Sequence, residues 1–148
     1  MNFTIDAPQA TDKEGWQSLY RGYAEFYKMP MNSEILDTVW SWIQDPDNAF
    51  YCLLAKDQQE QCIGLMHYRA MPSPLRGTNV GFLDDLFISD NHRGAGLAQA
   101  LFEQLEQQAK HHNWPAVRWI TAEDNHRAKA VYEKLANKTH WLTYQLNC

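Results

Sequence analysis

Cysteine is scarce in this chain: Cys52, Cys62 and Cys148 are odd in number and fit no metal-ligand spacing. Two of them lie in apolar runs, which is typical of buried thiols in a reduced compartment. A chain of 148 residues buries roughly two-thirds of its unfolded surface, so it needs neither a disulfide nor a metal ion to hold a core. We therefore expect a single domain over residues 1–148.

Long apolar runs and an excess of positive charge are also absent. No run reaches the length of a membrane span, and residues 1–6 have neither the basic start nor the apolar segment of a signal peptide. The formal net charge of -5 disfavours a general nucleic-acid binder and is compatible with a cationic substrate. We expect a cytoplasmic protein that binds neither membranes nor nucleic acid.

The spacing of the histidines predicts no metal site. His111 and His112 are adjacent and cannot share one helical face. The other four have no partner at ligand spacing: His67, His92, His126 and His140.

The chain does contain a regular succession of apolar patterns. Runs rich in β-branched and aromatic residues predict six strands, at 3–7, 50–55, 63–69, 82–88, 117–122 and 141–146. Apolar residues at helical spacing predict four helices, at 16–27, 33–43, 97–113 and 126–136.

Local signals refine these boundaries. Thr11 and Glu14 have the spacing of a capping box before the first helix, and Asn32 or Ser33 is expected to cap the second. Residues 72–79 read as a turn-rich loop before the central strand. The order of elements predicts a mixed α/β fold, mostly antiparallel, with a right-handed strand-helix-strand crossover that joins parallel strands.

The central strand leads through a glycine-bearing loop directly into a helix. A helix N-terminus presents unpaired N–H groups and partial positive charge, and glycines allow a phosphate to approach them. Arg93 adds a positive charge beside Gly94 and Gly96. The loop therefore outlines an anion site, although the two glycines could equally do no more than shape the turn.

Two nucleotide-binding motifs are excluded by the same stretch. A dinucleotide fingerprint needs a third glycine at position 99, which is Gln99, and would open the fold instead of following three strands. A phosphate-binding Walker loop needs Gly-Lys followed by Ser or Thr, which is absent.

The pattern that does fit resembles the GNAT superfamily of N-acetyltransferases. In that family an Arg/Gln-x-x-Gly-x-Gly/Ala motif binds the pyrophosphate of acetyl-CoA, and every position is matched here by Arg93, Gly94, Ala95, Gly96, Leu97 and Ala98. Residues 121–135 are similar to the family's Asn-x-x-Ala-x-x-x-Tyr-x-Lys-Leu segment. One departure is Ala136-Asn137, where the family often has Gly-Phe.

The resemblance implies a single-domain GNAT fold, with helices on a mixed, mostly antiparallel sheet and a parallel central strand pair splayed around acetyl-CoA. It implies that backbone N–H groups among Leu86, Phe87 and Ile88 bind the co-substrate and stabilise the oxyanion. Asn125 and Ala128 are expected to contact the co-substrate, and Tyr132 to protonate the departing thiolate. A buried tyrosine that only packs is the alternative for Tyr132.

Two carboxylates interrupt the central strand. Strand alternation predicts that Asp84 and Asp85 point to opposite faces, and either could bind the acceptor's ammonium group. Resemblance to spermidine/spermine N-acetyltransferases, which tend to carry Glu-Asp here, favours Asp84 as the acceptor-site group and as a base. A carboxylate that only pairs with an arginine is an equal alternative.

These patterns predict an acetyl-CoA-dependent N-acetyltransferase that acts on a primary amine by direct attack in a ternary complex. The resemblance to polyamine and histone-and-polyamine acetyltransferases favours a polyamine or small diamine. A lysine side chain in a protein or peptide is the second candidate, and an inactive acyl-CoA-binding module is the alternative of another class. A homodimer is expected from the family.

Overall fold

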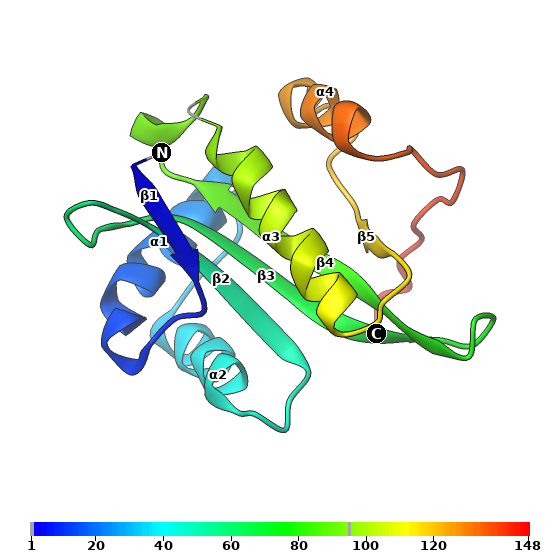
Figure 1. The fold of residues 1–148 in the computed structure, drawn as a ribbon, viewed down its shortest axis with the longest axis horizontal. Coiled ribbons are helices and arrows are strands. Elements are labelled where there is room, and N and C mark those ends of the chain that lie inside the picture. The colour runs from blue at the N-terminus through cyan, green and yellow to red at the C-terminus, as the bar shows by residue number, and fades with distance from the viewer. Residues whose placement is uncertain (1, 95) are drawn as a thin grey trace.

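The computed structural model describes residues 2–94 and 96–148, and within them four α-helices flank a five-stranded sheet (Figure 1). The strands are β1 (Phe3–Asp6), β2 (Phe50–Asp57), β3 (Cys62–Ser73), β4 (Thr78–Ile88) and β5 (Val117–Trp119). The helices are α1 (Lys13–Phe26), α2 (Ser33–Gln44), α3 (Leu97–His111) and α4 (His126–Leu135). In the described chain no helix is both long and apolar enough to cross a membrane.

The strands lie in sequence order, β1-β2-β3-β4-β5. The first four pair antiparallel, and β5 pairs parallel to β4 after the crossover through α3. This confirms the predicted mixed α/β class and the parallel crossover pair.

Helices cover both faces of the sheet (Figure 1). On one face α3 contributes Leu97, Leu101 and Leu105 to a core shared with alternate residues of β2, β3 and β4. On the other face α1 and α2 contribute Trp16 and Leu36 to a second core. Each fully buried side chain of this size stabilises the fold by roughly 1.5–3 kcal/mol, so the amphipathic helices are fixed mainly by packing.

The sixth predicted strand, at 141–146, is wrong, because these residues form neither helix nor strand. Four large apolar side chains of the segment are 77–88% exposed: Trp141, Leu142, Tyr144 and Leu146. Apolar alternation marks a segment that can pair, but a strand forms only against a partner edge. Within the described residues, β5 is paired to β4 alone.

One local prediction was also wrong. The capping box at Thr11 is not formed: Asp12 accepts a bond from the Gln9 N–H at 2.7 Å in a short 3-10 turn, and α1 begins at Lys13. The turn expected at 72–79 is present but shorter, at 74–77, since β3 extends to Ser73 and β4 begins at Thr78. The cap at Asn32 is confirmed, because its side chain accepts from the Ile35 N–H at 2.8 Å.

An irregularity in β4 positions the site. His67 pairs with Asp85, but the next residue, Tyr68, pairs with Leu83, which leaves Asp84 as the extra residue of a β-bulge. On the other side of β4, pairing with β5 ends at Leu83. The two parallel strands are therefore paired up to the bulge and unpaired beyond it.

The bulge also overturns the prediction that the two aspartates point to opposite faces. Asp85 contacts His67 and Asp84 contacts Arg69, and these two partners are two residues apart on β3. Residues two apart on a strand share a face, so both carboxylates lie on the face covered by α1 and α2. The expectation from strand alternation was wrong because Asp84 is an extra residue in the strand, and such a bulge changes the direction of a side chain.

Candidate active site

The half of β4 beyond the bulge has an open edge. The Ser89 N–H donates to the Ile63 oxygen of β3 at 3.0 Å, and alternate residues of a strand direct their N–H groups to the same side. The Phe87 N–H therefore points toward β3, whereas those of Leu86 and Ile88 point to the side where β5 has diverged. Of the three predicted backbone donors, two are free to meet a ligand.

The glycine loop leads from this edge to an uncapped helix. Gly94 and Gly96 have φ of +81° and +79°, and a Cβ built on either would meet no atom within 4 Å. Among the described residues, the first turn of α3 has no acidic residue and no side-chain cap, so its N–H groups remain available. Leu97 is buried in the core and Ala98 is half-buried, while the predicted contact Ala95 lies outside the described residues.

Arg93 lies between the loop and the open edge of β4. Its Nε donates to the Ile88 oxygen at 3.1 Å, and Nη1 pairs with Asp90 at 2.9 Å. The guanidinium also lies over the rings of Phe26 and Phe87, at 5.4 and 5.6 Å from their centroids. The positive charge therefore lies at the edge where the sequence predicted it.

Tyr132 is half-buried on α4. Its ring packs against Trp119 and Phe102, with centroids 5.5 and 5.9 Å apart. Burial raises the pKa of its hydroxyl, and Tyr27, the residue that follows α1, adds to the rise.

Asn125 and Ala128 meet at the start of α4. The Asn125 side chain accepts from the Ala128 N–H at 3.3 Å and caps the helix. A cap of this kind stabilises a helix by about 1 kcal/mol, which is a structural reason for an asparagine here. A contact of either residue with the co-substrate stays a prediction.

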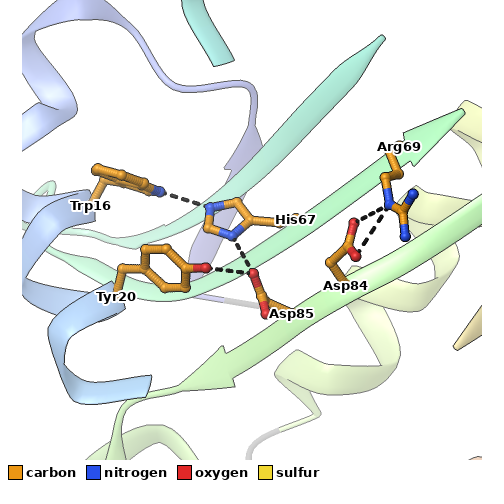
Figure 2. Close-up of polar contacts among 6 residues, drawn as sticks. All are labelled: Trp16, Tyr20, His67, Arg69, Asp84 and Asp85. Atoms are coloured by element: carbon orange, nitrogen blue, oxygen red, sulfur yellow. Dashed lines mark hydrogen bonds and ion pairs between the residues drawn. The ribbon is translucent and has the colours of Figure 1, made fainter. Parts of the chain in front are cut away.

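Asp85 is the centre of a polar cluster beneath α1 (Figure 2). Its Oδ2 lies 2.8 Å from Nδ1 of His67 and accepts from the Tyr20 hydroxyl at 2.9 Å. His67 is fully buried, and its Nε2 accepts from the indole N–H of Trp16 at 2.9 Å. Burial alone would raise the pKa of Asp85, but hydrogen bonds from His67 and the neighbouring tyrosines hold it below the ordinary value of 3.8.

Asp84 forms a separate ion pair beside this cluster (Figure 2). Both of its oxygens accept from Nε of Arg69, at 3.2 and 3.0 Å. Burial raises the pKa of Asp84 against the lowering effect of Arg69. The guanidinium lies over the Phe82 ring at 4.8 Å, and 44% of the Arg69 side chain is exposed.

Sequence reasoning missed four residues of these clusters: Trp16, Tyr20, His67 and Arg69. The two aromatic residues read as ordinary core positions of an amphipathic helix. His67 and Arg69 did carry a signal, because each interrupts an apolar strand run on the same face. Nothing local indicated that the β4 carboxylates would lie opposite them.

Comparison with known families matches residues 16–136 to the Acetyltransferase (GNAT) family. The chain belongs to the GNAT acetyltransferases. A curated relative, the D-amino-acid N-acetyltransferase HPA3 of Saccharomyces cerevisiae, is 31% identical over 144 residues, which cover 97% of this chain and 89% of the yeast protein. The protein is therefore an acetyl-CoA-dependent N-acetyltransferase.

Solved structures of this GNAT fold agree with the architecture. The ribosomal-protein-alanine N-acetyltransferase of Brucella melitensis biovar Abortus 2308 matches with a TM-score of 0.84 and 22% identity, over 99% of both chains. The aminoglycoside 6'-N-acetyltransferase AAC(6')-Ih of Acinetobacter baumannii matches with a TM-score of 0.81 and 21% identity, over 99% of this chain and 98% of that chain. At these identities the likeness shows the fold alone.

The residues present fit the co-substrate of GNAT enzymes. Open space at two left-handed glycines and the free N–H groups of α3 suit a pyrophosphate, and the open edge of β4 suits an extended amide chain. When bound, acetyl-CoA supplies an acetyl thioester.

Proposed function

We propose that this enzyme acetylates the amino group of a free amino acid. The observation that carries the proposal is the pair of opposite charges on one face of the sheet: the Asp85 carboxylate and the Arg69 guanidinium. Asp85 binds His67, and His67 and Arg69 are two residues apart on β3, a backbone spacing of about 7 Å. The two charged groups therefore lie as neighbours on one face, which suits the ammonium and carboxylate of one zwitterion. The yeast relative acts, by its name, on D-amino acids, which supports the same class.

In this proposal Asp85 binds the acceptor's ammonium group, a role that the sequence resemblance gave to Asp84. Asp84 instead orients Arg69 by accepting from its Nε, which leaves both terminal nitrogens of the guanidinium for a carboxylate. The acceptor then attacks directly, in a ternary complex with acetyl-CoA.

The remaining roles follow from the edge of β4 and from α4. The N–H groups of Leu86 or Ile88 donate to the developing oxyanion, and Tyr132 protonates the leaving thiolate. The loop residues Arg93 to Ala98 and the start of α3 hold the pyrophosphate. These assignments rest on geometry and on family resemblance.

The test is thiol release from acetyl-CoA with a panel of acceptors: D- and L-amino acids, their methyl esters, spermidine, short diamines and a lysine-rich peptide. We expect the strongest turnover with amino acids that keep a free carboxylate. Arg69→Gln should raise the KM for these acceptors roughly tenfold or more and leave the esters nearly unchanged. Arg76→Gln, an exposed arginine in the β3–β4 turn, is the matched control.

A polyamine or small diamine is the second candidate, favoured by the two adjacent carboxylates and the net charge of -5. The Arg69→Gln variant separates the two candidates by the direction in which the KM for the acceptor changes. Arg69 repels a polycation, so Arg69→Gln should lower the KM for a polyamine. Turnover with spermidine but not with amino acids, together with that lowering, would contradict the amino-acid proposal.

Two further possibilities become outcomes of the panel. Turnover confined to the lysine-rich peptide would favour a protein or peptide lysine acceptor. Tight acetyl-CoA binding without turnover on any amine would favour the inactive binding module. We also propose a homodimer, supported by the exposed apolar side chains of residues 141–146.

A further inference from the structure

A buried chain of hydrogen bonds stands behind the carboxylate of Asp85. Trp16 and His67 are both 0% exposed, and their side chains meet at 2.9 Å between Nε1 and Nε2. His67 continues to Asp85 through Nδ1 at 2.8 Å (Figure 2). The chain links α1, β3 and β4, and no acetyl-transfer step described above uses Trp16 or His67.

The donor at one end of this chain fixes the tautomer of His67. An indole N–H can only donate, so Nε2 of His67 must carry the lone pair that accepts it. The ring proton therefore lies on Nδ1 and is donated to Asp85. A proton on Nε2 would place the N–H of His67 against the indole N–H of Trp16, and two donors that face each other in a buried site are costly.

The bonds from His67 and Tyr20 both end on Oδ2 of Asp85, and Tyr23 adds a hydrogen bond to the same carboxylate. The Asp85 side chain is still 14% exposed. The carboxylate is therefore anchored through Oδ2 and remains partly accessible to a ligand.

We propose that His67 and Trp16 are positioning residues that hold the partly exposed carboxylate of Asp85 toward the acceptor's ammonium group. Trp16 binds Nε2 of His67, His67 anchors Oδ2 through Nδ1, and the carboxylate is left with a fixed direction. The role rests on the proposed function only in that the acceptor enters as an ammonium ion. It does not depend on which amine that is.

The tautomer is tested directly on the unliganded enzyme. Nitrogen NMR of protein labelled with 15N-histidine, with His67 assigned by comparison with His67→Asn, should show a proton on Nδ1 and a hydrogen-bonded Nε2. In Trp16→Phe the signal of the hydrogen bond at Nε2 should be lost, while Nδ1 keeps its proton beside Asp85. A His67 ring protonated at Nε2 in the wild type would overturn the proposal, whatever the acceptor is.

Kinetics test the positioning role. Trp16→Phe and His67→Leu should each raise the acceptor KM roughly tenfold to a hundredfold, with kcat and the KM for acetyl-CoA changed by less than about threefold. His67→Asn should rescue part of the loss, because its amide nitrogen can replace the Nδ1 donor. Trp40→Phe is the matched control, because the Trp40 ring packs 5.1 Å from the Trp16 ring, centroid to centroid, but makes none of the hydrogen bonds that link Trp16, His67 and Asp85.

The outcomes separate this proposal from the proposed function. If the wild type turns over an amine and both variants stay folded with an unchanged acceptor KM, the positioning role is overturned and the function stands. If amino acids fail but another amine is acetylated, the amino-acid proposal fails and the same KM comparison is made with that amine.

Discussion

The ring of Tyr132 packs against the α3-side core, on Trp119 and Phe102. Burial there raises the pKa of its hydroxyl, and Tyr27, which follows α1, adds to the rise. A phenol in this position is held by packing and remains protonated, as a proton donor requires.

Replacing Tyr132 with Phe should lower kcat roughly 100-fold or more while acetyl-CoA binding is kept, because the ring and its packing remain and only the proton donor is lost. Steady-state kinetics and calorimetric titration with acetyl-CoA measure the two effects. Unchanged turnover would contradict the assigned acid role.

The wild type should also keep its acid at alkaline pH, because the pKa of Tyr132 lies above the ordinary 10.0. The donor is then lost only as the pH rises through that higher value. A fall in kcat centred below pH 10 that disappears in Tyr132→Phe would contradict this.

Among the elements, the start of α3 has a conformation that side chains other than glycine rarely adopt. Gly96 serves as the N-cap in the left-handed region, and Gly94 precedes it in the same region. Space around both is open, so backbone strain decides the cost of a substitution there.

Gly96→Ala should cost about 1 kcal/mol of stability and weaken acetyl-CoA binding roughly tenfold, because strain shifts the loop that presents the α3 N–H groups. Gly77→Ala is a matched control: Gly77 also has a positive φ, +64°, and open space, but lies in the β3–β4 turn. Chemical denaturation should show similar losses for both variants. Only Gly96→Ala should change the affinity for acetyl-CoA, and equal affinities would argue against the loop as the binding site.

At the scale of the whole molecule, the sheet presents its open end between two groups of helices. Tyr132 reaches this end from the α3 and α4 side, and Asp85 lies on the side covered by α1 and α2. A co-substrate on the edge of β4 would therefore have the proposed proton donor, Tyr132, on one side and the proposed acceptor-binding group, Asp85, on the other. That arrangement is compatible with the proposed direct transfer.

The exposed apolar segment at 141–146 supports a prediction at the same scale. We expect the enzyme to sediment as a homodimer, and the double variant Trp141→Asp, Tyr144→Asp to sediment as a monomer, because charge opposes burial of the segment. Leu75→Asp is the control, since Leu75 is fully exposed but isolated in the β3–β4 turn. A monomeric wild type, or a variant that stays dimeric, would contradict the prediction.

Local sequence was sufficient to predict the order of the helices and of the first five strands, the mixed α/β class and the glycine loop before α3. These depend on periodicity and on residues adjacent in the chain, which local sequence encodes. It also indicated Tyr132 and the two aspartates as candidates, through motifs on single elements.

The contacts of those candidates depend on how the elements pack in three dimensions. His67 and Asp85 are 18 residues apart, and Trp16 and His67 are 51 apart, so their contacts exist only once β3, β4 and α1 pack together. The bulge at Asp84 depends on register between strands and placed both aspartates on one face. The segment at 141–146 has the apolar pattern of a strand but no strand partner in the described chain. A strand forms only when its backbone can pair with a neighbouring strand, and local sequence does not determine whether that neighbour is available.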